Sequence, residues 1–408
     1  MTDRQLFLQH IAQTSDFPLG LEIERAEGVF IFGQDGTAYM DLISGIGVSN
    51  VGHRHPHVLE AIHNQLDKYL HLMVYGEYVQ TPQTQLAHAL TQTLPETLNT
   101  VYFTNSGTEA VEGAMKLAKR YTGRREIISC FNAYHGSSQG ALSLSGDENF
   151  KRNYRPLLPG IRHIQHGNQA HIGQITQQTA AVVMEVIAAE AGVRVPDAAY
   201  LQAVRQRCTE VGALLIFDEI QTGFGRTGTF WAFEGFGAVP DILLCAKGMG
   251  GGMPIGAFIS SAGIMQVFRT NPILGHITTF GGHPVSCAAS LATLQVIQGH
   301  STGARSAGAE TLYEQAEAKG QLFRQLLVHP VIKAIRGKGL MLAVEFDSFA
   351  VLKPIIDQAI TQGIITDWFL FCDNSMRIAP PLIITETQIR EACAVILEAI
   401  EACTEVAA

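Results

Sequence analysis

Short apolar runs that end on polar residues recur through the middle of the chain. Between residues 100 and 260 they read TVYFTN, EIISCF, AAVVMEV, ALLIFDE, DILLCAK and GAFIS, and helix-like segments separate several of them. Apolar runs of this length are typical of strands that are buried on both faces. Their alternation with helices predicts an α/β fold whose central sheet is mostly parallel and has helices on both faces.

The two ends of the chain carry different patterns. GVFIFGQDGTAYMDL alternates around Asp35 and Gly36 and predicts a hairpin. The tail contains a helix-like segment at 309–327, the strand-like run MLAVEF and an amphipathic helix from about residue 386. A chain of 408 residues favours more than one domain. We therefore predict a large α/β domain at 51–300, a smaller α+β domain at 301–408, and an N-terminal segment at 1–50 that packs with the small domain.

Composition and charge narrow the range of partners. Hydrophobic residues make up 47% and charged residues 16% of the chain, as in globular proteins, and the net charge of −9 argues against nucleic acid or an anionic membrane. No apolar run is long enough to span a membrane, and the first residues lack a signal-peptide core. Seven scattered cysteines form neither a CxxC motif nor a disulfide framework, which favours the cytoplasm.

Polar residues follow four of the predicted strands. The strands end on SGTEA at 106–110, on NAYHG at 132–136, on Asp218 and on Lys247. Ligands of open α/β sheets bind beyond the carboxyl ends of the strands. We therefore expect a helix N-terminus, an aromatic ring, a carboxylate and an amine to share one cleft.

The segment SGTEAVEGAMKLAKRY predicts a helix at 107–121. Ser106 and Glu109 match a capping box, which explains the segment as a well-capped helix start. Free N–H groups in a first turn that begins with Gly107 would also bind a phosphate. The pattern alone leaves both interpretations open.

The other strand-end residues also have two interpretations each. Asp218 either caps the next loop or holds a proton on a heterocyclic nitrogen. Lys247 either extends to solvent or serves as a Schiff-base amine, kept reactive by partial desolvation. Tyr134 and His135 either fill a loop or contact an aromatic cofactor. The order of these features along one sheet is more specific than any one of them.

With these motifs the chain resembles the class III family of pyridoxal phosphate (PLP) aminotransferases, which have the fold-type-I architecture. The resemblance covers nearly the whole chain and is carried by the motifs GHRHP, NSGTEA, NAYHG, LLIFDEIQTGFGRTGTF, PDILLCAKGMGGGMPIGA, TTFGGHPVSCA and MRIAPPLI. It implies PLP as cofactor and a ping-pong transfer of an amino group, expected to be a terminal one, from an amine donor to 2-oxoglutarate or pyruvate. It also implies a homodimer with shared active sites.

The resemblance also implies a role for individual residues. Lys247 would form the Schiff base with the cofactor and later move the proton, and Asp218 would pair with the pyridine nitrogen. Tyr134 would stack on the ring, Gln221 would lie near the ring hydroxyl, and Thr279 would reach the phosphate in the neighbouring subunit. Arg377 would bind a substrate carboxylate. The expected cofactor-binding set is Ser106, Gly107, Thr108, Tyr134, His135, Glu185, Asp218, Gln221, Lys247 and Thr279.

The chain departs from the family pattern at two positions. Ser137 stands where the ornithine and acetylornithine branches have an arginine for the substrate α-carboxylate, which puts both specificities in doubt. Val186 follows Glu185 where the family has proline. Glu190 falls where the ornithine-like branch has an acid that pairs with the carboxylate-binding arginine. We hypothesise that Glu190 covers Arg377 while the amine is bound and swings aside for the acceptor, although Glu190 could also be an ordinary loop acid.

Other kinds of site are less well supported. His53, His55 and His57 alternate in GHRHPH, but the loop context and Pro56 oppose a metal site, and we expect none. GFGRTG lacks the GKT or GKS of a nucleotide loop, and no dinucleotide fingerprint follows a strand. An aminomutase or a decarboxylase on the same scaffold remains an alternative. A non-catalytic PLP-binding protein would be expected to lack Lys247 or Asp218.

Overall fold

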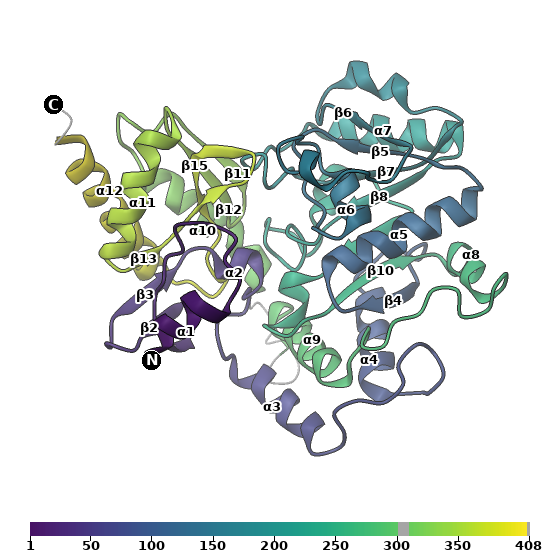
Figure 1. The fold of residues 1–408 in the computed structure, drawn as a ribbon, viewed down its shortest axis with the longest axis horizontal. Coiled ribbons are helices and arrows are strands. Elements are labelled where there is room, and N and C mark those ends of the chain that lie inside the picture. Colours follow the sequence, from purple (N-terminus) through teal and green to yellow (C-terminus); the bar gives the residue numbers. More distant parts are fainter. Residues whose placement is uncertain (301–309, 406–408) are drawn as a thin grey trace.

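The computed structural model describes residues 1–300 and 310–405, and a seven-stranded sheet forms its centre (Figure 1). The strands lie in the order β4-β10-β9-β8-β7-β5-β6. Their bounds are β4 Thr100–Thr104, β5 Glu126–Cys130, β6 Ile161–Ile164, β7 Thr179–Glu185, β8 Leu214–Asp218, β9 Ile242–Cys245 and β10 Gly256–Ser260. All but β10 run in one direction. The predicted mostly parallel sheet is thus confirmed.

The reversed direction of β10 follows from the chain that precedes it. A parallel neighbour needs a crossover of about a dozen residues or more. Residues 246–255, which hold the short 3-10 helix η4 (Lys247–Gly250), are too few for such a crossover, and β10 pairs antiparallel with both β9 and β4.

Alternate residues of the strands point into two separate cores. Leu215, Phe217 and Leu243 pack on the face covered by α3, α4, α7 and α9, whereas Ile216 and Leu244 pack on the face covered by α5, α6 and α8. The bounds of these helices are α3 Pro56–Leu66, α4 Thr81–Thr91, α5 Gly107–Thr122, α6 Gln139–Leu144, α7 Ala198–Val211, α8 Ala262–Met265 and α9 Pro284–Ile297. Helices therefore cover both faces, as predicted. Short 3-10 helices lie at η1 Arg152–Tyr154, η2 Gln169–Gln174, η3 Ala232–Phe236 and η5 Gln266–Arg269.

The two ends of the chain build two further sheets. One has the order β1-β2-β3-β13 and the other β11-β12-β15-β14. The bounds are β1 Ile23–Glu27, β2 Phe30–Gly33, β3 Ala38–Asp41, β11 Ala334–Lys338, β12 Met341–Glu345, β13 Ile364–Ile365, β14 Trp368–Phe369 and β15 Cys372–Ile378. The predicted hairpin around Gly36 is β2–β3, and Gly36 takes the positive φ of 84° that its turn needs.

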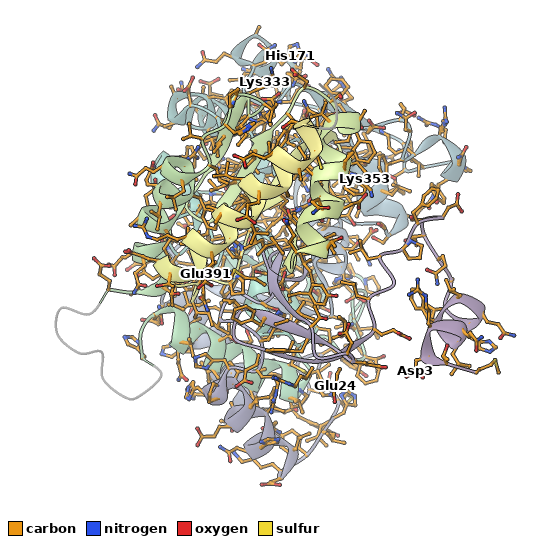
Figure 2. The ribbon with its side chains drawn as sticks, turned by 90° about the vertical axis from the view of Figure 1, so that its left-hand side faces the viewer. Asp3, Glu24, His171, Lys333, Lys353 and Glu391 are labelled. Atoms are coloured by element: carbon orange, nitrogen blue, oxygen red, sulfur yellow. The ribbon has the colours of Figure 1, made fainter. Side chains whose placement is uncertain are left out.

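Helices α10 (Leu312–Leu326), α11 (Phe349–Thr361) and α12 (Glu386–Glu405) pack on these sheets. Figure 2 shows α11 and α12 side by side, with Lys353 and Glu391 on their outer surfaces. The short helices α1 (Asp3–His10) and α2 (Ser44–Gly47) belong to the N-terminal segment, whose Val29, Met40 and Leu42 share a core with the C-terminal helices. The predicted start of the small domain, residue 301, lies outside the described residues, and the division into domains stays a prediction.

Candidate functional site

The carboxyl ends of the central strands border a cavity of about 530 Å³. This volume is within the range of small-molecule sites in proteins. Ten of the predicted site residues line it together: Ser106, Gly107, Thr108, Tyr134, His135, Glu185, Glu190, Asp218, Gln221 and Lys247. Residues that are far apart in the sequence thus meet where the strand-end rule places them.

Lys247 follows β9 and Ala246 and begins η4 with a φ of 45°, a left-handed conformation that is uncommon outside glycine. Its Nζ has no hydrogen-bond or ion-pair partner among the described residues. Burial lowers the pKa of Lys247, and Arg377 lowers it further, while the Glu190 carboxylate opposes both. An unpaired amine with a depressed pKa is suited to act as a nucleophile or a base.

Asp218 ends β8 and is 4% exposed. Its Oδ2 lies 2.7 Å from Nδ1 of the buried His135, and its Oδ1 accepts a hydrogen bond from the backbone N–H of Ile220 at 3.0 Å. A carboxylate oxygen can accept a further hydrogen bond, so Asp218 can still receive one from a protonated ring nitrogen. The contact with His135 was not anticipated from the sequence.

The start of α5 faces the same cavity. The Ser106 hydroxyl accepts a hydrogen bond from the Glu109 N–H at 3.3 Å, as predicted for a helix cap. The reciprocal half of the predicted capping box is wrong, because the Glu109 carboxylate accepts from the Asn105 N–H at 2.7 Å instead of from Ser106. The Ser106 N–H and the first N–H groups of α5 are therefore donors that an anion in the cavity can use.

A chain of hydroxyl groups fixes the side chain of Thr108. The Ser138 hydroxyl donates to Glu112 Oε1 at 2.6 Å, and Thr108 Oγ1 lies 2.6 Å from Ser138 Oγ. Since a hydroxyl has one proton, Thr108 must be the donor in the second bond. The hydroxyl proton of Thr108 thus points to Ser138. The backbone N–H groups are therefore the hydrogen-bond donors that remain free for an anion such as phosphate at this position.

Arg377 lies on β15 and is 3% exposed, behind the residues that line the cavity. Its Nη1 and Nη2 donate to the two carboxylate oxygens of Glu190 at 2.9 and 3.1 Å. The pairing that the switch hypothesis requires is present. Its Nε donates to Asp367 Oδ1 at 2.7 Å, a partner that sequence reasoning missed.

Both members of the Arg377–Glu190 pair are held in the charged form. Burial disfavours ionisation of Glu190, but Arg377 outweighs it and lowers the pKa of Glu190. Burial likewise opposes the charge of Arg377, whereas Glu190 and Asp367 raise the pKa of Arg377. Glu190 occupies both terminal nitrogens of Arg377, so another anion could bind them only if Glu190 moved.

Glu185, which ends β7, is buried beside Asp218. Its Oε1 accepts from the Ala189 N–H at 3.0 Å, and its Oε2 has no hydrogen-bond partner within the described residues. Burial raises the pKa of Glu185 well above its ordinary value, and the Asp218 charge adds to the shift. An unpartnered buried oxygen at the wall of the cavity is a polar group that a ligand can satisfy.

Thr279 is the one predicted site residue that is classed as exposed, and it does not line the cavity. Its neighbour Thr278 accepts a hydrogen bond from the Asn105 side chain at 3.3 Å. Asn105 itself lines the cavity and was missed, although it follows β4 directly and the strand-end rule could have found it. Other lining residues, to which the sequence analysis assigned no individual role, are Val48, Gly136, Ile220, Thr222 and the loop 252–255.

The histidines of GHRHPH bind different partners. His53 Nε2 lies 2.9 Å from Asp41 Oδ2, and His57 Nε2 lies 2.9 Å from Gln295 Oε1. Within 1–300 and 310–405 no group of three or more His, Cys, Asp or Glu side chains is placed to hold a metal.

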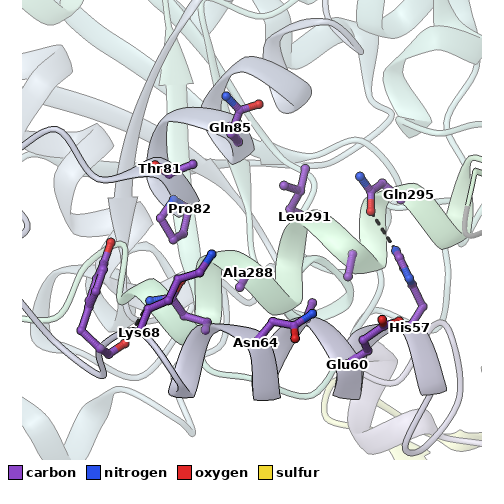
Figure 3. A pocket seen from close by; sticks show the side chains of 14 residues that line it. His57, Glu60, Asn64, Lys68, Thr81, Pro82, Gln85, Ala288, Leu291 and Gln295 are labelled. Atoms are coloured by element: carbon purple, nitrogen blue, oxygen red, sulfur yellow. Dashed lines mark hydrogen bonds between the residues drawn. The ribbon is translucent and has the colours of Figure 1, made fainter. Parts of the chain in front are cut away.

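A second cavity, of about 400 Å³, lies between α3, α4 and α9 (Figure 3). The hydrogen bond between His57 and Gln295 lies at one end of it, and Leu291 and Pro82 form part of its wall. None of the predicted catalytic or cofactor-binding residues lines this cavity.

Comparison with known proteins agrees with this geometry. Residues 11–400 match the family model described as aminotransferase class-III. The chain belongs to the class III aminotransferases. An acetylornithine aminotransferase of Methanopyrus kandleri is 36% identical over 396 residues, which cover 96% of this chain and 97% of that protein. A putrescine aminotransferase of Pectobacterium atrosepticum is 40% identical over 381 residues, which cover 89% of this chain and 78% of that protein.

Solved structures of aminotransferases have the same fold. The ornithine aminotransferase of Toxoplasma gondii, described with partial occupancy of PLP at its active site, superposes with a TM-score of 0.89 at 29% identity, covering 98% of this chain and 94% of that one. A transaminase from the marine bacterium Virgibacillus superposes with a TM-score of 0.90 at 25% identity over 99% of both chains. The expected fold type and the PLP dependence of this class III aminotransferase are confirmed. Among its described residues, no helix is long and apolar enough to cross a membrane.

Proposed function

We propose that this class III aminotransferase takes a terminal amino group from a donor that has no carboxylate next to the reacting amine, and passes it to a 2-oxo acid. The observation that carries the proposal is the closed Arg377–Glu190 pair beside a cavity wall that offers the hydroxyl of Ser137 instead of an arginine. Without a free guanidinium, an α-carboxylate gains no bidentate partner in this state.

The residues of the cavity divide the work of the reaction. The N-terminus of α5, with Ser106, would bind the phosphate of PLP, and Asp218 would hold a proton on the ring nitrogen, positioned by His135. Tyr134 would lie on the ring, with Gln221 near the ring hydroxyl, and Glu185 lies beside Asp218. When bound, PLP supplies the electron sink for the reaction.

Lys247 would then work as the proton carrier. Its pKa is already lowered by burial, so the amine accepts a proton from the substrate carbon at neutral pH more readily than an ordinary lysine. After the donor product leaves, Glu190 would swing off Arg377, and the freed guanidinium fork would bind the carboxylate of the oxo acid. One cavity could thus serve two unlike substrates in turn.

A homodimer is part of this proposal. Large apolar side chains are exposed along two segments that contact each other: Leu66, Leu70, Leu72, Tyr78 and Val79 on one, and Ile273, Leu274, Ile277 and Phe280 on the other. The ring centroids of His71 and Phe280 are 4.7 Å apart. A surface of this kind is typical of a protein interface, and it contains Thr279, the residue assigned to the neighbouring phosphate site.

We also propose that the protein works in the cytoplasm. All seven cysteines are free thiols, and five of them are buried. A reducing compartment preserves such thiols.

The test is a half-reaction with the purified, PLP-loaded enzyme. Putrescine, 4-aminobutyrate, β-alanine, lysine, ornithine and acetylornithine are each added without an acceptor, and the amine form of the cofactor is measured by absorbance. Terminal amines should convert the cofactor stoichiometrically. Acetylornithine also reacts at a terminal amine, but it should be a poor donor because its remote α-carboxylate finds Ser137 where an arginine would bind it. An aminomutase or a decarboxylase would return the cofactor to its starting form, and that result would refute the proposal.

A variant tests the switch separately. Glu190→Ala leaves the Arg377 fork uncovered, so donors without a carboxylate should react more slowly, by about tenfold. Glu190→Gln keeps the size of the side chain and serves as the matched comparison. Unchanged donor half-reactions in both variants would exclude the switch while leaving the aminotransferase activity intact.

A further inference from the structure

Arg377 has a second carboxylate partner, for which the donor–acceptor switch gives no role. Asp367 lies just before β14, and its Oδ1 accepts from the Nε–H of Arg377 at 2.7 Å. Glu190 accepts from the other edge, at Nη1 and Nη2. The two carboxylates therefore hold different edges of one planar guanidinium. Asp367 and the Trp368 carbonyl occupy the Nε side, so the Nη1/Nη2 edge held by Glu190 is the fork that can be freed for a substrate carboxylate.

The remaining contacts of Arg377 come from the same short segment. The backbone N–H of Arg377 donates to the backbone carbonyl of Asp367 at 2.9 Å. The side-chain Nη2 of Arg377 donates to the Trp368 carbonyl at 3.3 Å. The ring of Phe369 lies 4.4 Å from the guanidinium carbon. Among the described residues Glu190 and Asp367 are the only carboxylates bonded to Arg377. In the described part of the chain, Asp367 is thus the one carboxylate that stays bonded to Arg377 once Glu190 leaves.

Burial makes that second anion important. Arg377 is 3% exposed, and a buried cation that loses its sole anionic partner is strongly destabilised. Without an anionic partner, Arg377 would either pull Glu190 back or change its own side-chain conformation. The backbone carbonyl of Asp367 accepts from the backbone of Arg377, and among the described residues its side chain is hydrogen-bonded only to Nε.

We propose that Asp367 is a positioning residue for the acceptor site: it holds the Nε edge of Arg377 so that the fork keeps its place and a counter-ion while Glu190 is displaced by the carboxylate of the oxo acid. This inference rests on the proposed function, because it assigns the acceptor carboxylate to Arg377. Asp367 acts only in the acceptor half of the cycle, since Glu190 itself completes the pair in the donor half.

Steady-state kinetics of Asp367→Ala and Asp367→Asn test this role. Asp367→Ala should raise the KM for 2-oxoglutarate about tenfold or more, the effect of losing a hydrogen bond to a charged group. The donor half-reaction should stay within about twofold, since Glu190 still covers Arg377. Asp367→Asn should recover most of the affinity, because its amide oxygen can still accept from Nε.

Asp347→Ala is the matched control. Asp347 is an exposed carboxylate paired with Lys333 at 3.1 Å, and its loss should change neither half-reaction. Any of three results would overturn the proposal. They are an unchanged KM in Asp367→Ala, an equal loss of rate in both half-reactions, and an Asp367→Asn variant as impaired as Asp367→Ala. Asp367→Ser, too short to reach Nε, replaces the Ala variant if that protein does not fold.

Ligand binding gives a readout that needs no turnover. In the Glu190→Ala background the fork is uncovered, and calorimetry with glutarate, a non-reacting dicarboxylate, measures its affinity directly. Adding Asp367→Ala should weaken glutarate binding about tenfold. Equal affinities would overturn the role of Asp367. A wild-type enzyme that transfers no amino group to any oxo acid would instead refute the proposed function, and the glutarate comparison would still stand as a test of Asp367.

Discussion

Asp218 is held by His135, a residue 83 positions earlier in the chain. The Nδ1–H of His135 donates to the carboxylate, and among the described residues its buried Nε2 has no partner. This bond fixes the direction in which Asp218 presents its oxygens to the cavity. The His135 side chain therefore determines how well the acid can pair with a ring nitrogen.

Replacing His135 should weaken the cofactor site. In His135→Ala the PLP affinity should fall by about 10- to 100-fold, the value of a hydrogen bond to a charged group. The PLP affinity of His135→Asn should fall much less, because its amide N–H can take the place of Nδ1–H. Fluorescence titration of the cofactor-free proteins measures both. His163→Ala, outside the cavity, is the control, and equal affinities for all three would show that His135 does not orient Asp218.

The pKa of Lys247 leads to a second prediction at the same scale. Burial lowers this pKa, so the neutral amine forms at a lower pH than in a free lysine, whose pKa is about 10.4. The rate of PLP uptake by the cofactor-free protein should therefore reach its plateau below that pH. Glu190 raises the pKa of Lys247, so Glu190→Gln should shift the profile to lower pH. A shift to higher pH, or none, would contradict this electrostatic assignment.

At the scale of the elements, the start of α5 depends on a glycine that fits closely against the next loop. A Cβ at Gly107 would lie 2.8 Å from Cδ1 of Ile220. Gly107→Ala must therefore shift Ile220 or the first turn of the helix, which carries the N–H groups assigned to the phosphate. We expect its PLP affinity to fall by about tenfold, the effect of one lost hydrogen bond to a charged group.

A second substitution separates this clash from other effects. Ile220→Ala removes the contacted atoms, so the double variant should bind PLP about as well as Ile220→Ala alone. Equilibrium dialysis of the four proteins measures the coupling between the two sites. If Gly107→Ala weakens binding equally with and without Ile220, the helix start is disturbed for a reason other than this contact.

The accuracy of the sequence-based predictions also differs between elements. The meeting of Asp218, Lys247 and the start of α5 was predictable, because parallel strands bring their carboxyl ends to one edge. Asp367 was not, because β14 has two residues and no hydrophobic period reveals so short a strand. The Asn105–Glu109 bond depends on side-chain rotamers rather than on spacing, so the capping box was only half right.

At the scale of the whole molecule, large apolar side chains lie exposed to solvent in one part of the surface. Val79 is 94% exposed and Ile273 is 74% exposed, and both belong to the pair of apolar segments at 66–79 and 273–280. Burying such side chains against a second copy would remove apolar area from water. In the proposed dimer the interface and the active site would be linked, because Thr279 lies within one of these segments.

A charge placed in this surface should separate the subunits. Val79→Asp would bury an unpaired carboxylate in the proposed interface, which should weaken dimerisation by about 30-fold or more, the scale of an interface hot spot. Aminotransferase activity should fall in proportion to the monomer fraction, since each site would lose the partner's Thr279. Sedimentation velocity across a range of protein concentrations measures the dissociation. Val328→Asp is the matched control, because Val328 is 73% exposed and lies outside these segments. If Val79→Asp remains dimeric and active while Val328→Asp dissociates, the interface lies on a different face.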